Sequence, residues 1–436
     1  MLYILGIFLI FLGIVLSIAL HEIGHLVPAK RSGVKVTQYM VGFGPTIWSR
    51  TKGDTEYGIK AIPLGGYIRM IGMFPPRASR GEDETHLQPT STGLTRQLNE
   101  QRSPAGVETI APEDVTRTFY RQPVRRKVLI MMGGPTMNLI IGVCLLIGSW
   151  TLYGEPAATN TILAVSECVK PATAVKAANL QCAPTDPQSP ALAAGLKAGD
   201  HIVAVDGTPI TEWKAVQSRI RVSADKPVTL TVERAGQRLD LTATPIKNQA
   251  YKDDKSDEII TVGFLGVTPT QELRPVPAAQ IGGRLIDGLA RTAQAIGNIP
   301  GKMEGVWKAA FGHGKRDVNG PIGVLGVSRI GGEIAQAPGL TNGLKANFIL
   351  QIIASTNLAL FVFNLLPLLP LDGGHVAGAL YEGARRQVAK LRRRRDPGPV
   401  DVSRMLPLIY VVSSVLIAMS LLLLYADIVN PVRLTQ

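Results

Sequence analysis

Four long apolar runs separate polar stretches along the chain. They cover residues 2–20, 128–152, 348–371 and 405–425, and none of them contains a charged residue. Each run is long enough to cross the hydrocarbon layer of a bilayer, about 30 Å, as an α-helix. A secretory signal is the alternative for the first run, but it lacks the basic residues before it and the small-residue cleavage site after it. The pattern predicts an α-helical polytopic membrane protein with four transmembrane helices.

The net charge of the chain follows the predicted topology. The 436 residues carry 46 Lys and Arg against 33 Asp and Glu, a net of +13, although the mean hydropathy is +0.17. Basic residues gather in segments 31–124 and 376–404, whereas segment 154–344 holds 20 basic and 18 acidic residues. Cytoplasmic loops of membrane proteins accumulate positive charge. We therefore expect both basic segments in the cytoplasm and both termini outside. We expect no nucleic-acid partner, although the basic run 392–395 leaves contact with nucleic acid or anionic lipid open.

Two histidines stand at the end of the first run, in the sequence HEIGH of residues 21–25. On a helix, His21 and His25 lie one turn apart on one face, so both imidazoles reach one zinc ion and Glu22 reaches water held there. Polar groups at membrane depth are costly unless they bind something or face water. A chance match is the alternative, but three polar groups in this register favour a metal site.

A catalytic zinc site needs a third protein ligand and an open position. The third run ends in NLLPLLPLDGGH, residues 364–375, where Pro367 and Pro370 break the helix. Asp372 follows as the lone acid of that span, at the same predicted depth as the two histidines. We expect Asp372 to be the third ligand. An ordinary Asp-Gly-Gly turn is the alternative, and His375 is the fallback ligand.

Together these motifs resemble the site-2 protease family of intramembrane zinc metalloproteases. The run GGPTMN, residues 133–138, is similar to the GPxxN element of that family, and GPIG, residues 320–323, is similar to another. The resemblance covers the chain apart from residues 73–116. It implies one Zn²⁺ per chain held by His21, His25 and Asp372, with Glu22 as general base and with Asn364 and Pro367 holding an unwound substrate.

Two further features bear on how a substrate would be held. Strands 46–51 and 55–62 around a Lys-Gly-Asp turn predict a β-hairpin. Its edge could pair with an extended peptide, and a plain surface hairpin is the alternative; the membrane-associated β-loop of the family favours the former. Asn138 and Asn364 carry amides at membrane depth, where each either contacts substrate or ties two helices together. We interpret Asn364 as substrate-binding and Asn138 as structural.

The segment between the second and third runs predicts a β-rich domain at residues 160–246. Its run SPALAAGLKAGD, residues 189–200, resembles the PDZ pattern. PDZ domains bind peptide ends by strand addition, and a filter against bulky substrates is an equal alternative. Cys168 and Cys182 both lie in this exported domain and predict a disulfide, with two buried thiols as the alternative.

The predicted organisation is therefore a four-helix membrane protein with an inserted extracytoplasmic α+β PDZ domain. Its segments, in order, are a first span at 1–30, a cytoplasmic segment at 31–124 with a β-hairpin at 38–72 and a flexible insertion at 73–116, a second span at 125–153, the PDZ domain at 160–246, a linker with amphipathic helices at 247–344, a third span at 345–375, a basic cytoplasmic loop at 376–404, a fourth span at 405–428 and an outer tail at 429–436.

These observations predict an intramembrane zinc endopeptidase of the cell membrane that cuts single-span membrane proteins near the cytoplasmic face. By the family resemblance, its substrates are anti-sigma factors already cut once outside the membrane. A non-enzymatic PDZ-bearing scaffold or chaperone is the alternative, but zinc binding alone needs no base at Glu22. A zinc peptidase of secreted peptides conflicts with the predicted topology. The sequence leaves the oligomeric state open.

Overall fold

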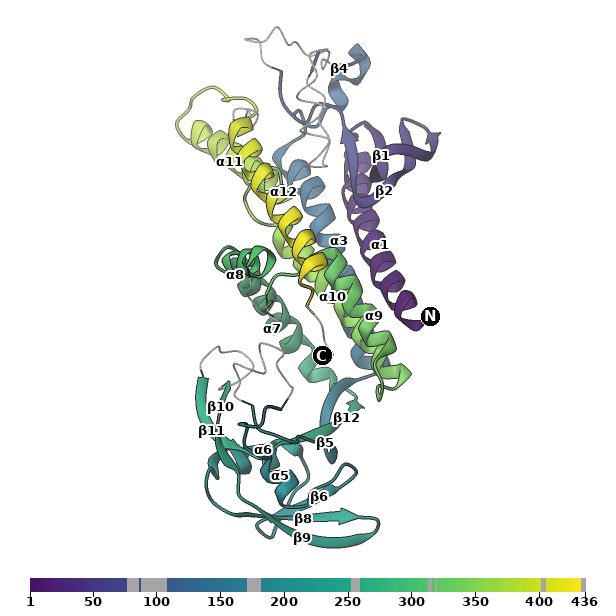
Figure 1. Cartoon of the computed structure of the whole chain (residues 1–436). Helices are drawn as coiled ribbons and strands as arrows, with labels where there is room; N and C mark the ends of the chain where they lie inside the picture. Colours follow the sequence, from purple (N-terminus) through teal and green to yellow (C-terminus); the bar gives the residue numbers. More distant parts are fainter. Residues whose placement is uncertain are drawn as a thin grey trace.

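The computed structural model describes residues 1–76, 86–87, 108–170, 182–251, 259–312, 316–317, 320–400 and 405–432. The molecule is elongated, with a bundle of helices at one end and a β-rich domain at the other (Figure 1). Four helices of the described part are long and apolar enough to cross a membrane, as the four apolar runs predict. They are α1 (Leu2–Arg31), α3 (Val124–Leu152), α10 (Asn342–Asn364) and α12 (Leu406–Val429).

The third span ends earlier than predicted. Helix α10 stops at Asn364, the next seven residues form turns, and α11 (Asp372–Leu391) begins at the predicted third ligand. Pro367 and Pro370 explain the interruption, because proline cannot donate the backbone hydrogen bond that a helix requires. The predicted basic segment at 376–404 is helical as far as Leu391. Its Lys and Arg residues are good helix formers.

Helices α1 and α3 touch through their backbones. A Cβ on Gly24 would overlap the carbonyl oxygen of Gly133, and a Cβ on Gly133 would overlap the carbonyl oxygen of Gly24. Small residues allow such close approach, which is how helices associate where lipid removes the hydrophobic driving force. A second contact of this kind joins Gly6 of α1 to Gly331 of α9 (Val324–Gln336). Helix α1 is thereby held along both of its halves.

The predicted hairpin is present with the predicted turn, but its strands are longer. Strands β1 (Val36–Lys52) and β2 (Thr55–Met70) pair antiparallel with several register shifts. Gly42 and Gly44 of β1 have φ angles of 93° and 84°, which glycine adopts without strain and which allow the strand to bulge. The base of the hairpin packs on α1, where Tyr39 Oη donates to the carbonyl oxygen of Ala19 at 3.0 Å. Most of the predicted insertion at 73–116 lies outside the described residues.

The β-rich domain is built on one antiparallel sheet whose strands differ in length. Its strand order is β12-β5-β6-β8-β9, with β7 added beside β6, and α6 (Trp213–Val222) packs against it. The prediction of a domain confined to 160–246 is wrong at its C-terminal boundary, because β12 comes from beyond it and pairs with β5. Local alternation of side chains does not reveal such distant pairing. The strands are β5 (Glu155–Val165), β6 (His201–Val205), β7 (Thr208–Pro209), β8 (Val228–Arg234), β9 (Gln237–Ala243) and β12 (Val267–Arg274).

A disulfide joins Cys168 to Cys182 in this domain, with an S–S distance of 2.02 Å. A separate two-stranded ribbon, β10 (Ile246–Tyr251) and β11 (Ile259–Phe264), extends the domain on the side of α6. The core consists of apolar side chains at or below 6 % exposure: Ile162, Ala191, Leu196, Ile202, Val205, Val216, Ile220, Val228, Leu230, Val232, Ala243 and Leu265.

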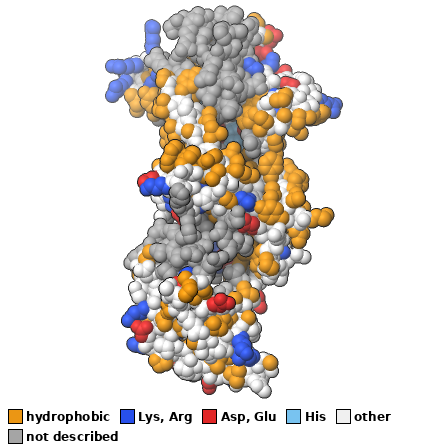
Figure 2. Space-filling model, in the orientation of Figure 1, with side chains coloured by type: hydrophobic (Ala, Val, Ile, Leu, Met, Phe, Trp, Pro, Cys, Tyr) orange, Lys and Arg blue, Asp and Glu red, His pale blue; other side chains and the backbone are white. Residues whose placement is uncertain are grey.

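Two amphipathic helices link the β domain to the bundle. Helix α7 (Ala278–Gly297) packs its apolar side against the cluster of α3 and α10, and α8 (Ile299–Phe311) packs against α12. The sequence predicts amphipathic helices in the linker at 247–344, and α7 and α8 lie there. Figure 2 shows hydrophobic side chains gathered mainly over the helical part of the visible face, as a surface in contact with lipid requires.

Candidate metal centre

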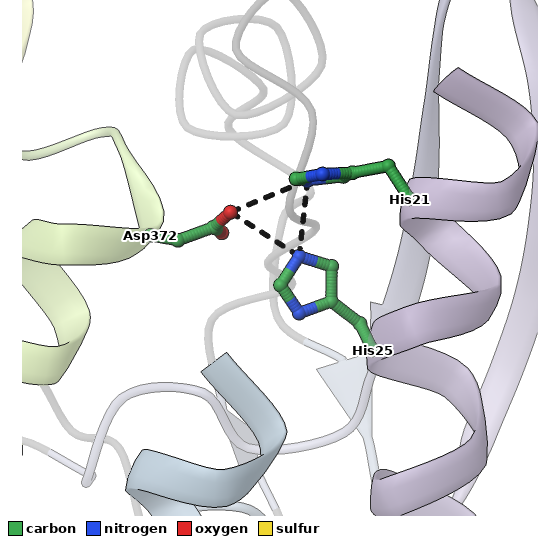
Figure 3. Close-up of side chains that lie close together, drawn as sticks. All are labelled: His21, His25 and Asp372. Atoms are coloured by element: carbon green, nitrogen blue, oxygen red, sulfur yellow. Dashed lines mark hydrogen bonds and ion pairs between the residues drawn. The ribbon is translucent and has the colours of Figure 1, made fainter. Parts of the chain in front are cut away.

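Three side chains from opposite ends of the chain meet beside α3. His21 and His25 project from α1, and Asp372 projects from the first turn of α11 (Figure 3). The Nε2 atoms of the two histidines are 3.2 Å apart, and each lies 3.3 Å from Asp372 Oδ2. The exposed fractions are 9 %, 0 % and 8 % for the three residues in chain order. They form a buried triangle of potential ligand atoms.

This triangle has the dimensions of a zinc site. Bonds of about 2.0–2.1 Å set at the tetrahedral angle hold neighbouring ligand atoms about 3.3–3.4 Å apart. Asp372 Oδ2 is buried and has no hydrogen-bond partner within the described part of the chain. A buried carboxylate oxygen without a partner is costly, and a cation satisfies it. The three residues therefore fit one zinc ion and leave a fourth position for another ligand.

The turn before α11 explains why two glycines follow the aspartate. A Cβ on Gly373 would overlap the backbone of Leu365 and Leu366, and one on Gly374 would overlap the backbone of Leu368 and Leu369. The chain that leaves α10 thus folds directly onto the start of α11. Asp372 gains further support from its place in the first turn, where the helix dipole favours a negative charge.

Helix α3 closes the site, in part with Asn138, for which the sequence predicts a structural role. The carbonyl oxygen of Ile130 lies 2.8 Å from His25 Nδ1, and the Asn138 amide lies 3.0 Å from His21 Nδ1. A Cβ on Gly134 would overlap the Nε2 atoms of both histidines. The signal that could have revealed these contacts is the spacing of Gly134 and Asn138, which puts them one turn apart on one helix face.

A pocket of about 220 Å³ opens beside the three potential ligands and brings Glu22 to the same space. Asn364 lines it as predicted for a substrate contact, whereas Pro367 does not, and Pro370 lines it instead. The hairpin supplies the opposite wall. The lining residues are Ile18, His21, Glu22, His25, Phe43, Gly65, Gly66, Asn138, Leu360, Asn364, Pro370, Leu371 and Asp372.

Tyr39 of the hairpin is a neutral neighbour of this site. Burial raises the pKa of its hydroxyl to about 12, and the negative charge of Glu22 adds to that rise. A tyrosine with such a pKa stays protonated at neutral pH. It can therefore keep its hydrogen bond to α1 without adding a charge beside Glu22.

His375, the fallback ligand, lies outside the triangle. Its buried ring stacks on Phe74 with a centroid distance of 6.3 Å. Within the described residues, the group of potential metal ligands consists of His21, His25 and Asp372. The geometry therefore favours the aspartate.

A second buried contact holds α11 against α3. Lys127 Nζ lies 3.1 Å and 2.9 Å from the two carboxylate oxygens of Glu382, and both side chains are at most 5 % exposed. Arg386 and the backbone N–H of Val400 also bind this carboxylate, at 3.0 Å and 3.2 Å. Because Glu382 and Asp372 belong to one helix, this network restrains the approach of Asp372 to the histidines.

Comparisons with known proteins point to the same chemistry. The model of "Peptidase family M50" matches residues 8–395 of the chain. The zinc metalloprotease Rip1 of Mycolicibacterium smegmatis is 34 % identical over 449 aligned residues, which cover all of both chains. Rip1 of Mycobacterium tuberculosis strain H37Rv is also 34 % identical, over 452 aligned residues and again all of both chains.

Proposed function

The chain belongs to peptidase family M50, the site-2 proteases, and is therefore a zinc metalloendopeptidase of the membrane; from this premise we propose that it cuts single-span membrane proteins in or near their transmembrane segment. The observation that carries the proposal is the buried triangle of His21, His25 and Asp372 beside Glu22. The zinc cofactor and the peptidase activity predicted from the sequence are confirmed by the family.

In the proposed mechanism, His21, His25 and Asp372 would hold the ion. Zinc supplies Lewis acidity, which polarises a scissile carbonyl and makes water nucleophilic near neutral pH. Glu22 takes a proton from the attacking water as the oxygen of that water bonds to the carbonyl carbon. When the C–N bond breaks, Glu22 returns that proton to the leaving amine. The common pocket of these side chains supports the proposed roles.

The substrate must present an extended backbone, because a helix hides its peptide groups in its own hydrogen bonds. Asn364, at the broken end of α10, has an amide that could bind the opened peptide. Gly65 and Gly66 of β2 form the facing wall, where a strand edge could pair with it. The proposed role of Pro367 is indirect: it helps to end α10 and so frees the segment that carries Pro370 and Leu371 into the pocket.

We further propose that the β domain is an extracytoplasmic PDZ domain and that the site lies near the cytoplasmic face. The basic segments beside Lys30 and in α11 support this orientation. Strand β12 stands at the end of the described sheet path, so its outer edge is available for strand addition. The domain would either bind a peptide end there or exclude substrates with bulky outer domains. Anti-sigma factors trimmed by an earlier cut are the substrate class that fits.

The Glu22→Gln variant tests the proposal. Replacing the carboxylate by an amide of the same shape removes the base, and we expect cleavage of a single-span reporter without its outer domain to fall by about 10²–10⁴-fold. Zinc content, measured by atomic emission, should remain near one ion per chain. Glu304→Gln, on the exposed side of α8, is the matched control. Cleavage by Glu22→Gln at the parent rate would refute the assignment.

A further inference from the structure

Both imidazoles of the candidate centre must offer the same ring nitrogen to a shared ion. In each of them Nε2 points into the triangle, 3.3 Å from Asp372 Oδ2. A histidine that binds a metal is a neutral imidazole, so when Nε2 carries the free lone pair, the ring proton sits on Nδ1. Each Nδ1 atom therefore requires a hydrogen-bond acceptor.

For His25 the backbone provides the acceptor. Its Nδ1 lies 2.8 Å from the carbonyl oxygen of Ile130, closer than the backbone nitrogen of Gly134, which lies 3.4 Å from the same atom. A carbonyl oxygen can only accept, so this contact requires the proton on Nδ1 and leaves Nε2 free. No substitution at position 130 would remove that backbone oxygen. The tautomer of His25 is thus determined by the path of α3.

For His21 the neighbour of Nδ1 is the amide of Asn138, which can either donate or accept a hydrogen bond. Asn138 Nδ2 lies 3.0 Å from His21 Nδ1, the residue is 0 % exposed, and its Oδ1 has no hydrogen-bond partner in the described structure. The oxygen and nitrogen of an amide exchange places by a half-turn about the Cβ–Cγ bond. With the nitrogen toward His21, the amide donates to Nδ1 and the imidazole proton moves to Nε2, which closes that atom to a metal.

With the oxygen toward His21, Oδ1 accepts the Nδ1 proton, the buried oxygen gains its partner and Nε2 stays free. We propose that Asn138 is a positioning residue that holds His21 in this tautomer and orientation as a zinc ligand. The inference rests on the proposed function and adds to it a residue of α3. Outer partners of metal-binding histidines typically account for 10–100-fold in metal affinity.

Three variants of the full-length protein in detergent test this role: Asn138→Asp, which keeps an acceptor of the same shape, and Asn138→Leu and Asn138→Ala, which remove it. The zinc dissociation constant is measured by competition with a chromophoric chelator, and the site is also loaded with cobalt(II) for its visible spectrum. We expect Leu and Ala to weaken zinc binding about 10–100-fold and to alter the cobalt spectrum. The Asp variant should bind zinc at least as tightly as the parent.

Asn347→Leu is the control, because Asn347 is equally buried but bonds to the carbonyl oxygen of Gly154, away from the site. It should leave zinc affinity unchanged. If the Leu variant does not fold, the Ala variant decides, since it adds no bulk. Equal weakening in Asp and Ala would indicate a packing role and overturn the proposal, as would parent affinity in a folded Ala variant.

The variant His21→Ala distinguishes failure of the proposed ligand set from failure of the proposed role of Asn138. Parent zinc affinity in His21→Ala would refute the proposed ligand set itself. Loss of zinc in His21→Ala together with parent affinity in Asn138→Ala would refute only the role of Asn138.

Discussion

The β domain and the membrane-spanning bundle are stabilised by different means. In the β domain, side chains such as Ile202, Leu230 and Val232 are fully buried in one apolar core, so removal of apolar surface from water supplies the main driving force. In the bundle, large apolar residues such as Phe8 and Leu129 remain 55 % and 59 % exposed in the protein alone. In a membrane these side chains contact lipid. Apolar burial therefore distinguishes little between one helix arrangement and another there.

The interior of the bundle is instead held by polar side chains and glycines. Ser17, Asn138 and Asn357 are at most 2 % exposed, and Asn357 Nδ2 donates to Ser17 Oγ at 2.8 Å to connect α10 with α1. Gly24 and Gly133 let α1 and α3 meet. A few directional contacts thus specify the arrangement that brings the potential ligands together. Substitutions in the two regions should therefore have separable consequences.

The largest effect is expected at the ligand triangle. Asp372→Ala removes one of three ligands and, with it, the buried oxygen that lacks another partner. We expect zinc affinity to fall at least about 100-fold, by loss of a full coordinate bond, while the melting transition of the β domain stays unchanged. Zinc content after dialysis measures the first effect and differential scanning calorimetry the second.

His201→Ala is the control for this variant, since that residue is exposed on β6. Stoichiometric zinc in Asp372→Ala would contradict the assignment and redirect attention to His375.

The buried ion pair of Lys127 and Glu382 should produce the next largest effect. Lys127→Met leaves a buried carboxylate with fewer partners, and breaking such a pair typically costs about 3–5 kcal/mol. We expect the bundle to denature at lower denaturant concentration and zinc affinity to fall with it, because α11 carries Asp372. The double variant Lys127→Met with Glu382→Leu should recover much of the stability, since no buried charge is left unpaired.

Lys308→Met at the exposed pair with Glu304 is the matched control and should change nothing measurable. A double variant that is less stable than Lys127→Met would show that the two helices need the ion pair itself.

The smallest effect is expected in the β domain, at Asp200. Its carboxylate is completely buried, accepts from Arg234 at 2.7 Å and 2.8 Å, and accepts from the backbone N–H of Lys197 at 2.9 Å. Burial alone would raise the pKa of this carboxyl, but the bonds from Arg234 and Lys197 outweigh it, so the pKa lies below 3.8. The stabilisation is therefore fully present above the unfolded pKa, about 3.9, and is lost as pH falls through the lower folded value.

Asp200→Asn should lower the melting temperature of the β domain by about 5 °C at pH 7 and should remove this component of its acid sensitivity. Thermal melts of the full chain between pH 3 and pH 7 measure both, and zinc affinity at pH 7 should match the parent. A parent and a variant with the same pH dependence would contradict the role of the buried carboxylate.

Much of the site was visible in the sequence because its signals are local. The spacing of His21 and His25 on one helix face depends only on helix geometry, and the breaks at Pro367 and Pro370 depend on the chemistry of proline. The role of Asn138 could not be read in this way. An amide at membrane depth has several possible partners, and only the crossing of α1 and α3 brings it to His21.

The amino-acid sequence alone determined the four spans, the presence of amphipathic helices in the linker and the residue types of a zinc site, since run length, periodicity and short motifs act within a few turns of chain. The tertiary structure decided which distant groups touch: β12 beside β5, Glu382 of α11 beside Lys127 of α3, and Asp372 within 3.3 Å of two imidazoles. Those contacts depend on the close approach of backbones at glycines and on which buried polar atoms form hydrogen bonds with one another. A local sequence pattern reveals neither.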